Sequence, residues 1–314
     1  MDPLSDVLSR LRVRSYWSAG FDFGGDWALA IGPYQGIKFY AVLAGDCWIA
    51  IDGVPGPVHA TAGDCVLLPS GRPFRVARDL AFTPVDPSVS LVGAKDGGMS
   101  VHNGGGHFLG IGGEFSLSGE LSEELLGVLP PLVHVHREQD REELRWCIER
   151  MRRELREPQP GGILVAQQLA TLLLVQALRV HLADGPQGVS WLSALADRQM
   201  AAALGAMHES PGAPWTVQSL AERAGMSRTS FALRFKETVG TAPLEYLTRW
   251  RMRVACDRLE RSKEPISAIG QALGYESQSA FSLAFKRVMG CSPGQYGRGR
   301  SPSEREATAS TSPG

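Results

Sequence analysis

The chain has 314 residues, of which 43% are hydrophobic and 21% are charged, and its formal net charge is −1. These values are ordinary for a soluble globular protein, and the length allows two domains with a sizeable core. The charge is unevenly spread, because residues 215–300 carry fourteen Lys and Arg against seven Asp and Glu. Such a split indicates a nucleic-acid-binding half joined to an acidic half with another role.

Composition also bears on where the protein works. The opening residues, MDPLSDVLSRLRVRS, lack the apolar core segment of a secretory signal. The most apolar helical stretch, Ile163–Ala183, contains several Gln, a Thr and an Arg, which argues against a membrane span. Five Cys, an odd number without disulfide-like spacing, fit a reducing cytosol. We therefore expect a cytoplasmic protein with no membrane partner.

From Trp27 to about Phe115 the sequence predicts strands. Short apolar runs are separated by Gly, Pro and Asp, and they read WALAI, IKFYAVLAG, CWIAIDG and CVLLP. Many short strands at this spacing are typical of a sandwich or a small barrel. The stretch from Gly93 to Gly113 is rich in Gly and predicts a loop that contains one weak strand, HFLGI.

Beyond Pro130 and Pro131 the pattern becomes helical. Two Gly- and Pro-containing breaks separate three predicted helices, which span Asp140–Glu157, Ile163–Ala183 and Ser190–His208. The middle helix is apolar around most of its circumference. We therefore expect it to be buried on two sides, against its own domain and against a second copy of the chain in a homodimer. A linker, PGAP, follows at residues 211–214.

The C-terminal half contains an internal repeat. Leu220–Pro243 and Ile269–Pro293 match at an offset of fifty from Phe231 and Phe281 onward, and upstream of these Phe residues the second copy has one extra residue. Each copy predicts a short helix, a tight turn at a Gly and a second helix that carries a buried Phe pair. This is the helix-turn-helix plan, whose second helix lies in the major groove of DNA. Helix pairs of this kind also occur in ordinary bundles, but two tandem copies in a basic segment favour DNA binding.

The blocks LAERAGMSRTSF and GYESQSAFSLAFKRVMGCSPGQY resemble the signature of the AraC/XylS family of bacterial transcription regulators. The resemblance covers the last hundred residues. It implies that each motif presents one recognition helix to double-stranded promoter DNA, and that a connecting helix, Pro243–Arg261, holds both on one face of the DNA. It also implies RNA polymerase as a further partner.

The predicted DNA contacts are the residues that face outward from the buried Phe pairs. Gln suits an adenine edge, Ser several bases, and Leu or Ala a thymine methyl, whereas cationic side chains more often hold phosphates. The first helix offers Arg228, Thr229, Ala232, Leu233 and Lys236, and the second offers Gln278, Ser279, Ser282, Leu283, Lys286 and Arg287. Leu233 stands where a polar reader is frequent in the family. We therefore expect the first helix to contribute more to docking than to base discrimination.

The N-terminal half resembles the cupin barrel found in one large branch of this family. GDCWIAIDG and AGDCVLLPSGRPFRVA carry the likeness. The positions of the family's metal ligands are occupied by Gly32, Tyr34, Lys38 and Phe74. A Lys and an aromatic ring cannot replace carboxylate and imidazole on a divalent metal, so the resemblance implies a sensing barrel with neither metal nor other cofactor.

These observations predict an α+β chain. Its parts are a cupin-like β-barrel that senses an effector at 1–137, a helical linker and dimerisation region at 138–210, an all-α DNA-binding domain with two helix-turn-helix motifs at 211–300, and a disordered tail at 301–314. The resulting function is a DNA-binding transcription regulator controlled by a small molecule.

A cupin interior is lined by alternate residues of its strands, so a pocket survives loss of the metal. The predicted effector contacts are Tyr34, Lys38, Tyr40, Trp48, Arg72, Phe74 and Arg75. Aromatic rings beside hydrogen-bonding groups suit a sugar, and the cations suit a nucleotide or an organic acid. The sequence leaves these classes open. Lys38 replaces the family's metal-binding Glu, so it needs either a bound molecule or a nearby acid as its partner.

Two cysteines offer an alternative mode of regulation. Cys47 and Cys65 both follow Gly-Asp in neighbouring predicted strands, and a thiol redox switch would use them. The commonest fate of a free Cys is to be a small buried hydrophobe, which is the reading we favour.

Metal and enzyme sites are weakly indicated. His134 and His136 alternate along a predicted strand, and His102 and His107 flank NGGG, but no Cys or carboxylate completes either pair. The chain has no P-loop or HExxH motif. A cupin enzyme fused to a DNA-binding domain is the remaining rival, and the missing ligands argue against it. We expect no catalytic residues.

Overall fold

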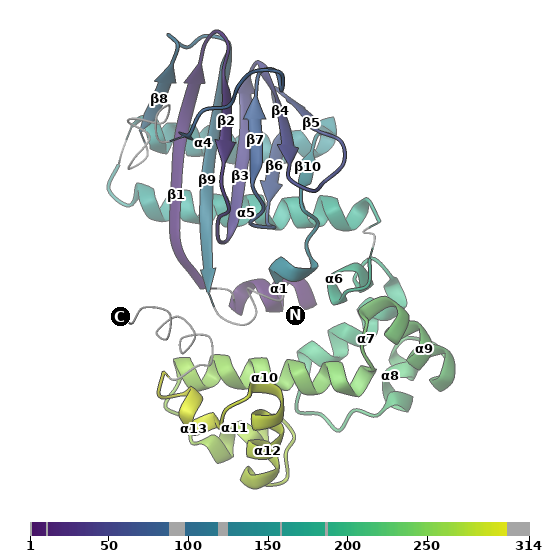
Figure 1. Ribbon diagram of the computed structural model, residues 1–314. Coiled ribbons are helices and arrows are strands. Elements are labelled where there is room, and N and C mark those ends of the chain that lie inside the picture. The colour runs from purple at the N-terminus through teal and green to yellow at the C-terminus, as the bar shows by residue number, and fades with distance from the viewer. Residues whose placement is uncertain are drawn as a thin grey trace, which may run out of the picture. The chain divides into compact units, whose positions relative to one another are not determined.

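The computed structural model describes residues 2–10, 12–87, 98–118, 125–157, 159–185 and 188–299. The chain divides into two compact units (Figure 1). One consists of Leu11–Asp184, and the other joins Met1–Arg10 to Gly185–Gly314. This division differs from the predicted boundaries: the helices at 138–183 belong with the barrel, and the first ten residues belong with the DNA-binding helices. The predicted tail at 301–314 lies outside the described residues.

The first unit is built on two sheets. The six-stranded sheet has the order β10-β6-β3-β9-β1-β8, and the four-stranded sheet has the order β2-β7-β4-β5. The strands span Arg12–Phe23 (β1), Ala28–Ile31 (β2), Ile37–Ala44 (β3), Asp46–Ile51 (β4), Val58–Thr61 (β5), Cys65–Leu68 (β6), Phe74–Ala77 (β7), Met99–His102 (β8), Phe108–Ser118 (β9) and Val133–Val135 (β10). All of these pairings are antiparallel except that of β1 with β8. The α+β class and the barrel-like N-terminal half are confirmed.

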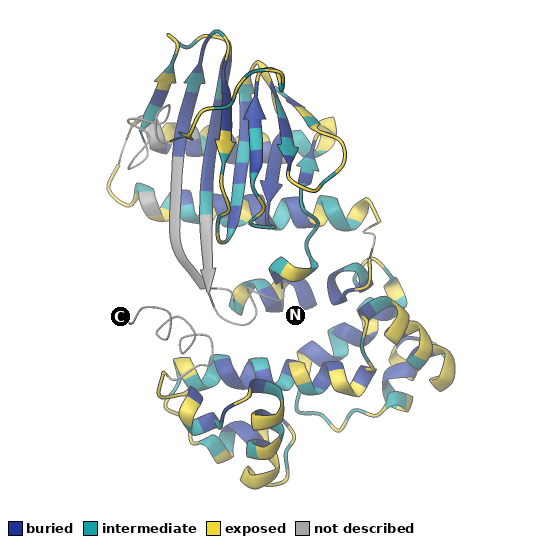
Figure 2. Cartoon of the chain, viewed as in Figure 1, coloured by how far each residue is buried: buried dark blue, intermediate teal, exposed yellow. Residues whose placement is uncertain are grey.

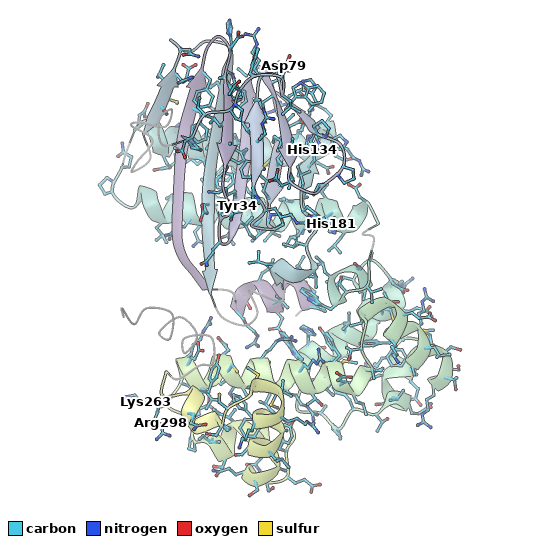
Figure 3. The ribbon with its side chains drawn as sticks, viewed as in Figure 1. Tyr34, Asp79, His134, His181, Lys263 and Arg298 are labelled. Carbon is cyan, nitrogen blue, oxygen red and sulfur yellow. The ribbon has the colours of Figure 1, made fainter. Side chains whose placement is uncertain are left out.

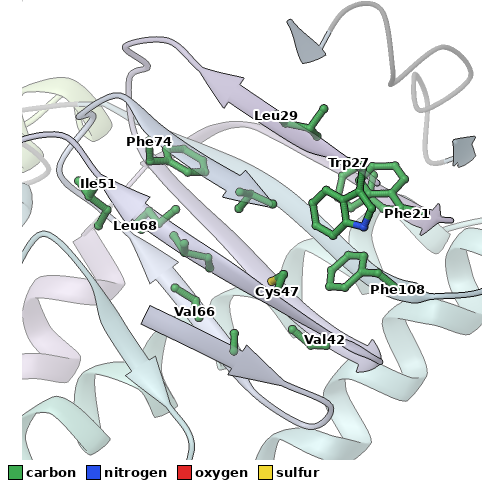
Figure 4. Packing of buried hydrophobic residues seen from close by; sticks show 14 of the residues in the cluster. Phe21, Trp27, Leu29, Val42, Cys47, Ile51, Val66, Leu68, Phe74 and Phe108 are labelled. Carbon is green, nitrogen blue, oxygen red and sulfur yellow. The ribbon is translucent and has the colours of Figure 1, made fainter. Parts of the chain in front are cut away.

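Alternation along the strands creates the core between the sheets. In β4, Cys47, Ile49 and Ile51 are buried in this core, while the residues between them are more exposed. Figure 4 shows aromatic side chains, among them Phe21 and Phe108, gathered with Leu29 inside the barrel. Because side chains alternate between faces, each strand contributes every second residue to the interior.

Two helices cover the outer face of the six-stranded sheet. They are α4 (Glu138–Arg156) and α5 (Gly162–Ala183), and Figure 1 shows them running across the strands. The sheet residues beneath them are apolar and buried, as Phe39, Leu67 and Val135 illustrate. Among the described residues, Leu164–Ala183 is the one helix that is long and apolar enough to cross a membrane. Its contacts with α4 and β10 make it a covering helix of this unit.

A buried carboxylate ties the barrel to these helices. Asp64 accepts from the Arg141 Nε of α4 at 2.8 Å, and its other oxygen lies 3.1 Å from His134 Nε2 of β10. Burial raises the pKa of Asp64, but hydrogen bonds from the Thr61 amide, His134 and Arg141 outweigh it and lower the pKa overall. His134, which the sequence offered as a metal ligand, thus has a structural partner.

The second unit is helical. Its elements are α1 (Pro3–Arg10), α6 (Trp191–Ala194), α7 (Arg198–Glu209), α8 (Val217–Arg223), α9 (Arg228–Val239), α10 (Pro243–Arg261), α11 (Ile266–Ala272), α12 (Gln278–Met289) and α13 (Pro293–Tyr296). The single helix predicted over Ser190–His208 is two helices, because Asp197 caps α7 through bonds from the Gln199 and Met200 amides and so starts a new helix.

Helix α1 joins this unit through buried polar contacts. Arg10 donates to Asp257 of α10 at 3.2 Å and lies over the Trp250 ring, while Asp6 Oδ2 lies 3.3 Å from His208 Nδ1. His208 in turn shares a hydrogen bond of 2.8 Å with the Tyr246 hydroxyl. The partners are far apart in sequence, so local pattern could not predict this docking.

Candidate nucleic-acid interface and barrel interior

The first motif consists of α8, a turn of residues 224–227 and α9. Thr216 begins α8 with a capping box, Gly225 takes a positive φ of 64° in the turn, and Ser227 caps α9. Phe231 and Phe235 lie one turn apart and are fully buried, with ring centroids 5.5 Å apart. The Phe pair therefore fixes which face of α9 is turned inward.

The second motif repeats this geometry. Gly274 takes a φ of 83° in a turn of residues 273–277, Ser277 caps α12, and the rings of Phe281 and Phe285 lie 5.8 Å apart. This turn is one residue longer than the first, as the repeat predicted. Tyr275, in this longer turn, packs edge-on against Phe281 at 5.5 Å.

A guanidinium holds the linker beside the second motif. Arg251 of α10 donates to the carbonyl oxygens of Pro211 and Ala213 at 2.6 and 2.9 Å, and lies over the Tyr275 ring. A Cβ on Gly212 would lie 2.2 Å from the Ala272 carbonyl oxygen, so the linker approaches the end of α11 more closely than any other residue type would allow. The linker is therefore packed against the DNA-binding unit.

The predicted contact residues lie on the outer faces of α9 and α12. Figure 2 shows both helices largely exposed on that side. All eleven are exposed or half-buried: Arg228, Thr229, Ala232, Leu233 and Lys236 on α9, and Gln278, Ser279, Ser282, Leu283, Lys286 and Arg287 on α12. Within the described residues, none of the four cations among them forms an ion pair, so all four remain available for phosphates.

One further cation on α9 has a different task. Arg234 lies beside Asp197 at 2.5 Å and donates to Gln199 Oε1 at 2.8 Å. These bonds join α9 to the start of α7. Local sequence patterns do not predict these bonds, because the partners lie more than thirty residues upstream and one of them is a helix cap.

The barrel interior contains an apolar cavity. Its wall is formed by Phe21, Phe23, Leu29, Ile49, Val76 and Phe108, with Tyr40 and Cys47 as the members that carry a polar hydrogen. About 450 Å³ of space lies inside the cavity, including its opening to solvent. This volume is within the range of pockets that bind small molecules.

Four of the predicted effector residues cluster at one end of this interior. Lys38 pairs with Glu114, its cross-strand neighbour on β9, and its Nζ lies 5.0 Å from the Tyr34 ring. The Tyr34 hydroxyl, labelled in Figure 3, donates to the Leu68 carbonyl at 2.7 Å. Phe74 lies edge-on to both Tyr34 and Tyr40. Lys38 has the acid partner that the sequence required, and of these four only Tyr40 reaches the cavity.

The other predicted effector residues do not join this cluster. Trp48 alternates with the interior residues of β4, so it lies on the outer face, where it stacks on His59 at 4.5 Å. Arg75 alternates with Phe74 and Val76 in the same way and donates to the carbonyls of Leu80 and Phe82. Arg72 is exposed in the turn before β7. Trp48 and Arg75 were predicted to line the pocket, but both lie on the outer face of their sheet.

The two cysteines point in opposite directions. Cys47 faces the barrel interior, whereas Cys65 is buried on the other face of its sheet, close to Cys147 of α4. Burial raises the pKa of each thiol to about 12. At neutral pH almost no thiolate is present at either residue, which favours packing over redox chemistry. The two residues do not form a pair.

The histidines do not form a metal site. Among the described residues, no three His, Cys, Asp or Glu side chains lie close enough together to hold a metal ion. His107 accepts from the Gly25 amide at 2.8 Å, and His102 packs edge-on against Phe23. His136 lies against His134, which is bonded to Asp64.

A duplicated helix-turn-helix on one connecting helix, in a chain that also contains a strand-built unit, is typical of a DNA-binding transcription regulator. The family model described as Cupin matches residues 2–183, and the one described as Helix-turn-helix domain matches residues 220–299. An AraC-like transcription regulator of Streptomyces lividans is 42% identical over 298 residues, which are 94% of this chain and 98% of that protein. The transcriptional regulator AlkR of Acinetobacter baylyi is 31% identical over 94% of this chain and 99% of its own length.

Solved structures also match the C-terminal part. The C-terminal domain of AraT from Geobacillus stearothermophilus is 33% identical and covers 34% of this chain and 88% of its own, with a TM-score of 0.31. The DNA-binding domain of AdpA, solved with a target DNA, is 26% identical and covers 40% of this chain and 100% of its own, with a TM-score of 0.29. From its full-length relatives, the chain belongs to the AraC family of transcription regulators, and its N-terminal part belongs to the cupins.

Proposed function

We propose that this regulator binds promoter DNA through both motifs of one chain and that a small molecule inside the barrel controls that binding. The observation that carries the first half is the pair of solvent-facing helices α9 and α12, each with unpaired cations beside polar or apolar readers. The observation that carries the second half is a cavity lined by both sheets of a barrel whose metal-ligand positions are lost. Its relatives are regulators, which favours sensing over catalysis.

The two-motif reading has a geometric test. Recognition helices on one face of the duplex contact successive major grooves about one turn, ~34 Å, apart. Footprinting on a fragment selected from genomic DNA should therefore show two protected blocks on one face, spaced by about ten base pairs. A single block under saturating protein would contradict the proposal.

Control by a barrel ligand has a separate test. A thermal-shift screen of the whole protein identifies compounds that stabilise the barrel unit, because a ligand that binds only the folded state raises its apparent stability. A compound found in this way should change the affinity for the selected DNA fragment. If stabilising compounds leave that affinity unchanged, then the barrel does not control DNA binding.

The chain is also proposed to work in the cytoplasm as a homodimer joined through α5. Leu164 and Leu172 are exposed on α5, at 61% and 38%, although the opposite side of the helix packs in its own unit. An exposed apolar face of this kind marks an interaction surface. Leu172→Glu should give a monomer by light scattering, whereas Leu244→Glu, the same change at an exposed position of α10, should not. A Leu172→Glu protein of unchanged mass would place the interface elsewhere.

A further inference from the structure

The barrel cavity identifies the chemical class of its ligand. We infer that the molecule bound there is small, uncharged and apolar, and not one of the sugars, nucleotides or organic acids that the sequence left open. This inference rests on the proposed sensing function and sharpens it. It depends on which side chains face the cavity and on where the nearest charges lie.

The cavity wall offers a ligand almost only carbon. Three Phe rings and the aliphatic Leu29, Ile49 and Val76 form most of it. Such a wall rewards the burial of apolar surface and gives nothing to the several hydroxyl groups of a sugar, each of which would lose its hydrogen bonds to water. A polar polyol is therefore excluded by the cost of leaving its hydroxyls unpaired.

A charged ligand is excluded for a related reason. The basic group near this interior, Lys38, is already paired with Glu114, and Arg75 is turned to the outer face, where it binds two carbonyl oxygens. Among the described residues, a carboxylate or phosphate in the cavity would have no free cation as a partner, and an unpaired buried charge is costly. Lys38 and Glu114 neutralise each other, so neither is free to pair with a charged ligand.

The hydroxyl of Tyr40 is the group that would orient the ligand, by donating a hydrogen bond to it. Its ring lines the cavity and packs edge-on against Phe74, and within the described residues its hydroxyl has no hydrogen-bond partner. Burial keeps this hydroxyl protonated by raising its pKa. A ligand with one weak acceptor would use it, and a hydrocarbon would not need it. The apolar wall and the volume of the cavity suit a ligand the size of a single ring or a short alkyl chain.

The experiment compares two probes of the same shape that differ in charge. Toluene and benzoate share one ring, and only benzoate carries a carboxylate. Saturation-transfer NMR and thermal unfolding of the full chain should show binding and stabilisation by toluene and neither effect by benzoate. Val76→Ile and Ile49→Met, two mild substitutions that change the cavity's volume or shape, should weaken toluene binding about tenfold or more. The double variant Lys38→Met with Glu114→Gln removes both charges at the other end and should leave toluene binding unchanged.

Each result decides between the possibilities. Benzoate binding that disappears in the double variant would overturn the apolar class and move the site to the charged end. Absence of toluene binding to a folded protein would also overturn it. Toluene binding that leaves DNA affinity unchanged would support the ligand class while contradicting control of DNA binding, so the two proposals fail separately.

A second inference concerns the base sequence that the protein recognises. Leu233 and Leu283 occupy equivalent positions of the repeat, fifty residues apart, and are 60% and 74% exposed. Each stands one turn after a hydroxyl-bearing residue, Thr229 or Ser279, and one turn before a lysine. A large apolar side chain gains nothing from facing water, and here the same exposure occurs twice.

We propose that each leucine contacts a thymine methyl group, so that the DNA site carries one recognised thymine in each of two adjacent major grooves. The C5-methyl group is the apolar feature of the major groove, and an aliphatic side chain is its natural contact. The neighbouring cations would hold the phosphates that place the helix.

Uracil tests this directly, because it lacks only the methyl group. Thymines of the selected site are replaced by uracil one at a time, and two replacements about one turn apart should each weaken binding about fourfold. Leu233→Ala should remove the effect of one replacement and Leu283→Ala that of the other. Leu244→Ala, which changes an exposed leucine outside both recognition helices, should remove neither. If no uracil replacement changes affinity, or if both Ala variants retain the full sensitivity, the proposal is wrong.

Discussion

The two helix-turn-helix motifs share a core and differ in their surroundings. Phe235 of the first packs edge-on against Tyr246 of α10, whereas Phe285 of the second packs against Tyr296 of α13. The first motif also contacts α6 and α7, whereas the second contacts α13 and lies beside the linker that Arg251 holds. A repeat in sequence therefore produces two equal binding helices on unequal supports. The outward-facing residues of α9 and α12 are therefore more alike than the elements that pack against the two motifs.

The largest expected effect comes from breaking the two cores. Phe235→Ala and Phe285→Ala should each cost about 3–5 kcal/mol in the free energy of unfolding, because a fully buried ring is lost. Since Phe235 touches the connecting helix, its loss should reduce both protected blocks in a footprint, while Phe285→Ala should reduce only one. Equal loss of both blocks in the two variants would mean that the motifs are supported alike.

A smaller effect separates the cations of the two motifs. Lys236 and Lys286 are equivalent, so replacing either with Ala should weaken binding to all sequences and reduce the salt dependence by about one. Arg234 is engaged by Asp197 and Gln199, and its equivalent in the second motif is Ala284. Arg234→Ala should destabilise α9 without changing the salt dependence. Binding measured at several salt concentrations checks this, and a reduced slope for Arg234→Ala would assign that residue to the DNA.

The smallest expected effect is a loss of stability at low pH that is confined to the first motif. Burial lowers the pKa of His208, although nearby Asp6 partly offsets it. The folded state therefore keeps His208 neutral, while the unfolded state takes up a proton near pH 6.5, so stability is present above that pH and falls as the pH is lowered toward 5. His208 bonds Tyr246, which supports Phe235.

Hydrogen exchange provides the measurement. Amides of α7 and α9 should exchange faster as the pH falls from 7 to 5, after correction for intrinsic rates, and those of α12 should change less. In a His208→Gln protein the difference between the motifs should disappear. Equal acceleration of both motifs in the wild type would show that His208 is not the source.

The sequence by itself determined the repeated part of this protein. The Gly turns, the Ser caps and the Phe pairs are local signals, and they fix which face of each recognition helix turns outward. The connecting helix spans Pro243–Arg261, as predicted, with Pro243 in its first turn. The short apolar runs predicted β2, β3, β4 and β6, whereas β1, β5, β7 and β8 were not among them. The long β9 was expected only as the weak strand HFLGI in a Gly-rich loop.

Only the tertiary structure decided the rest, because it depends on partners distant in the chain. Strand pairing fixes which alternate residues of β4 and β7 face inward, and a shift of one residue exchanges the faces, so Trp48 and Arg75 lie outside the barrel. The partner of Lys38 stands seventy-six residues away on β9. Helix α1 carries a helical pattern but no local sign that Asp6 will lie beside His208. Each of these contacts is made by folding together segments that no local rule connects.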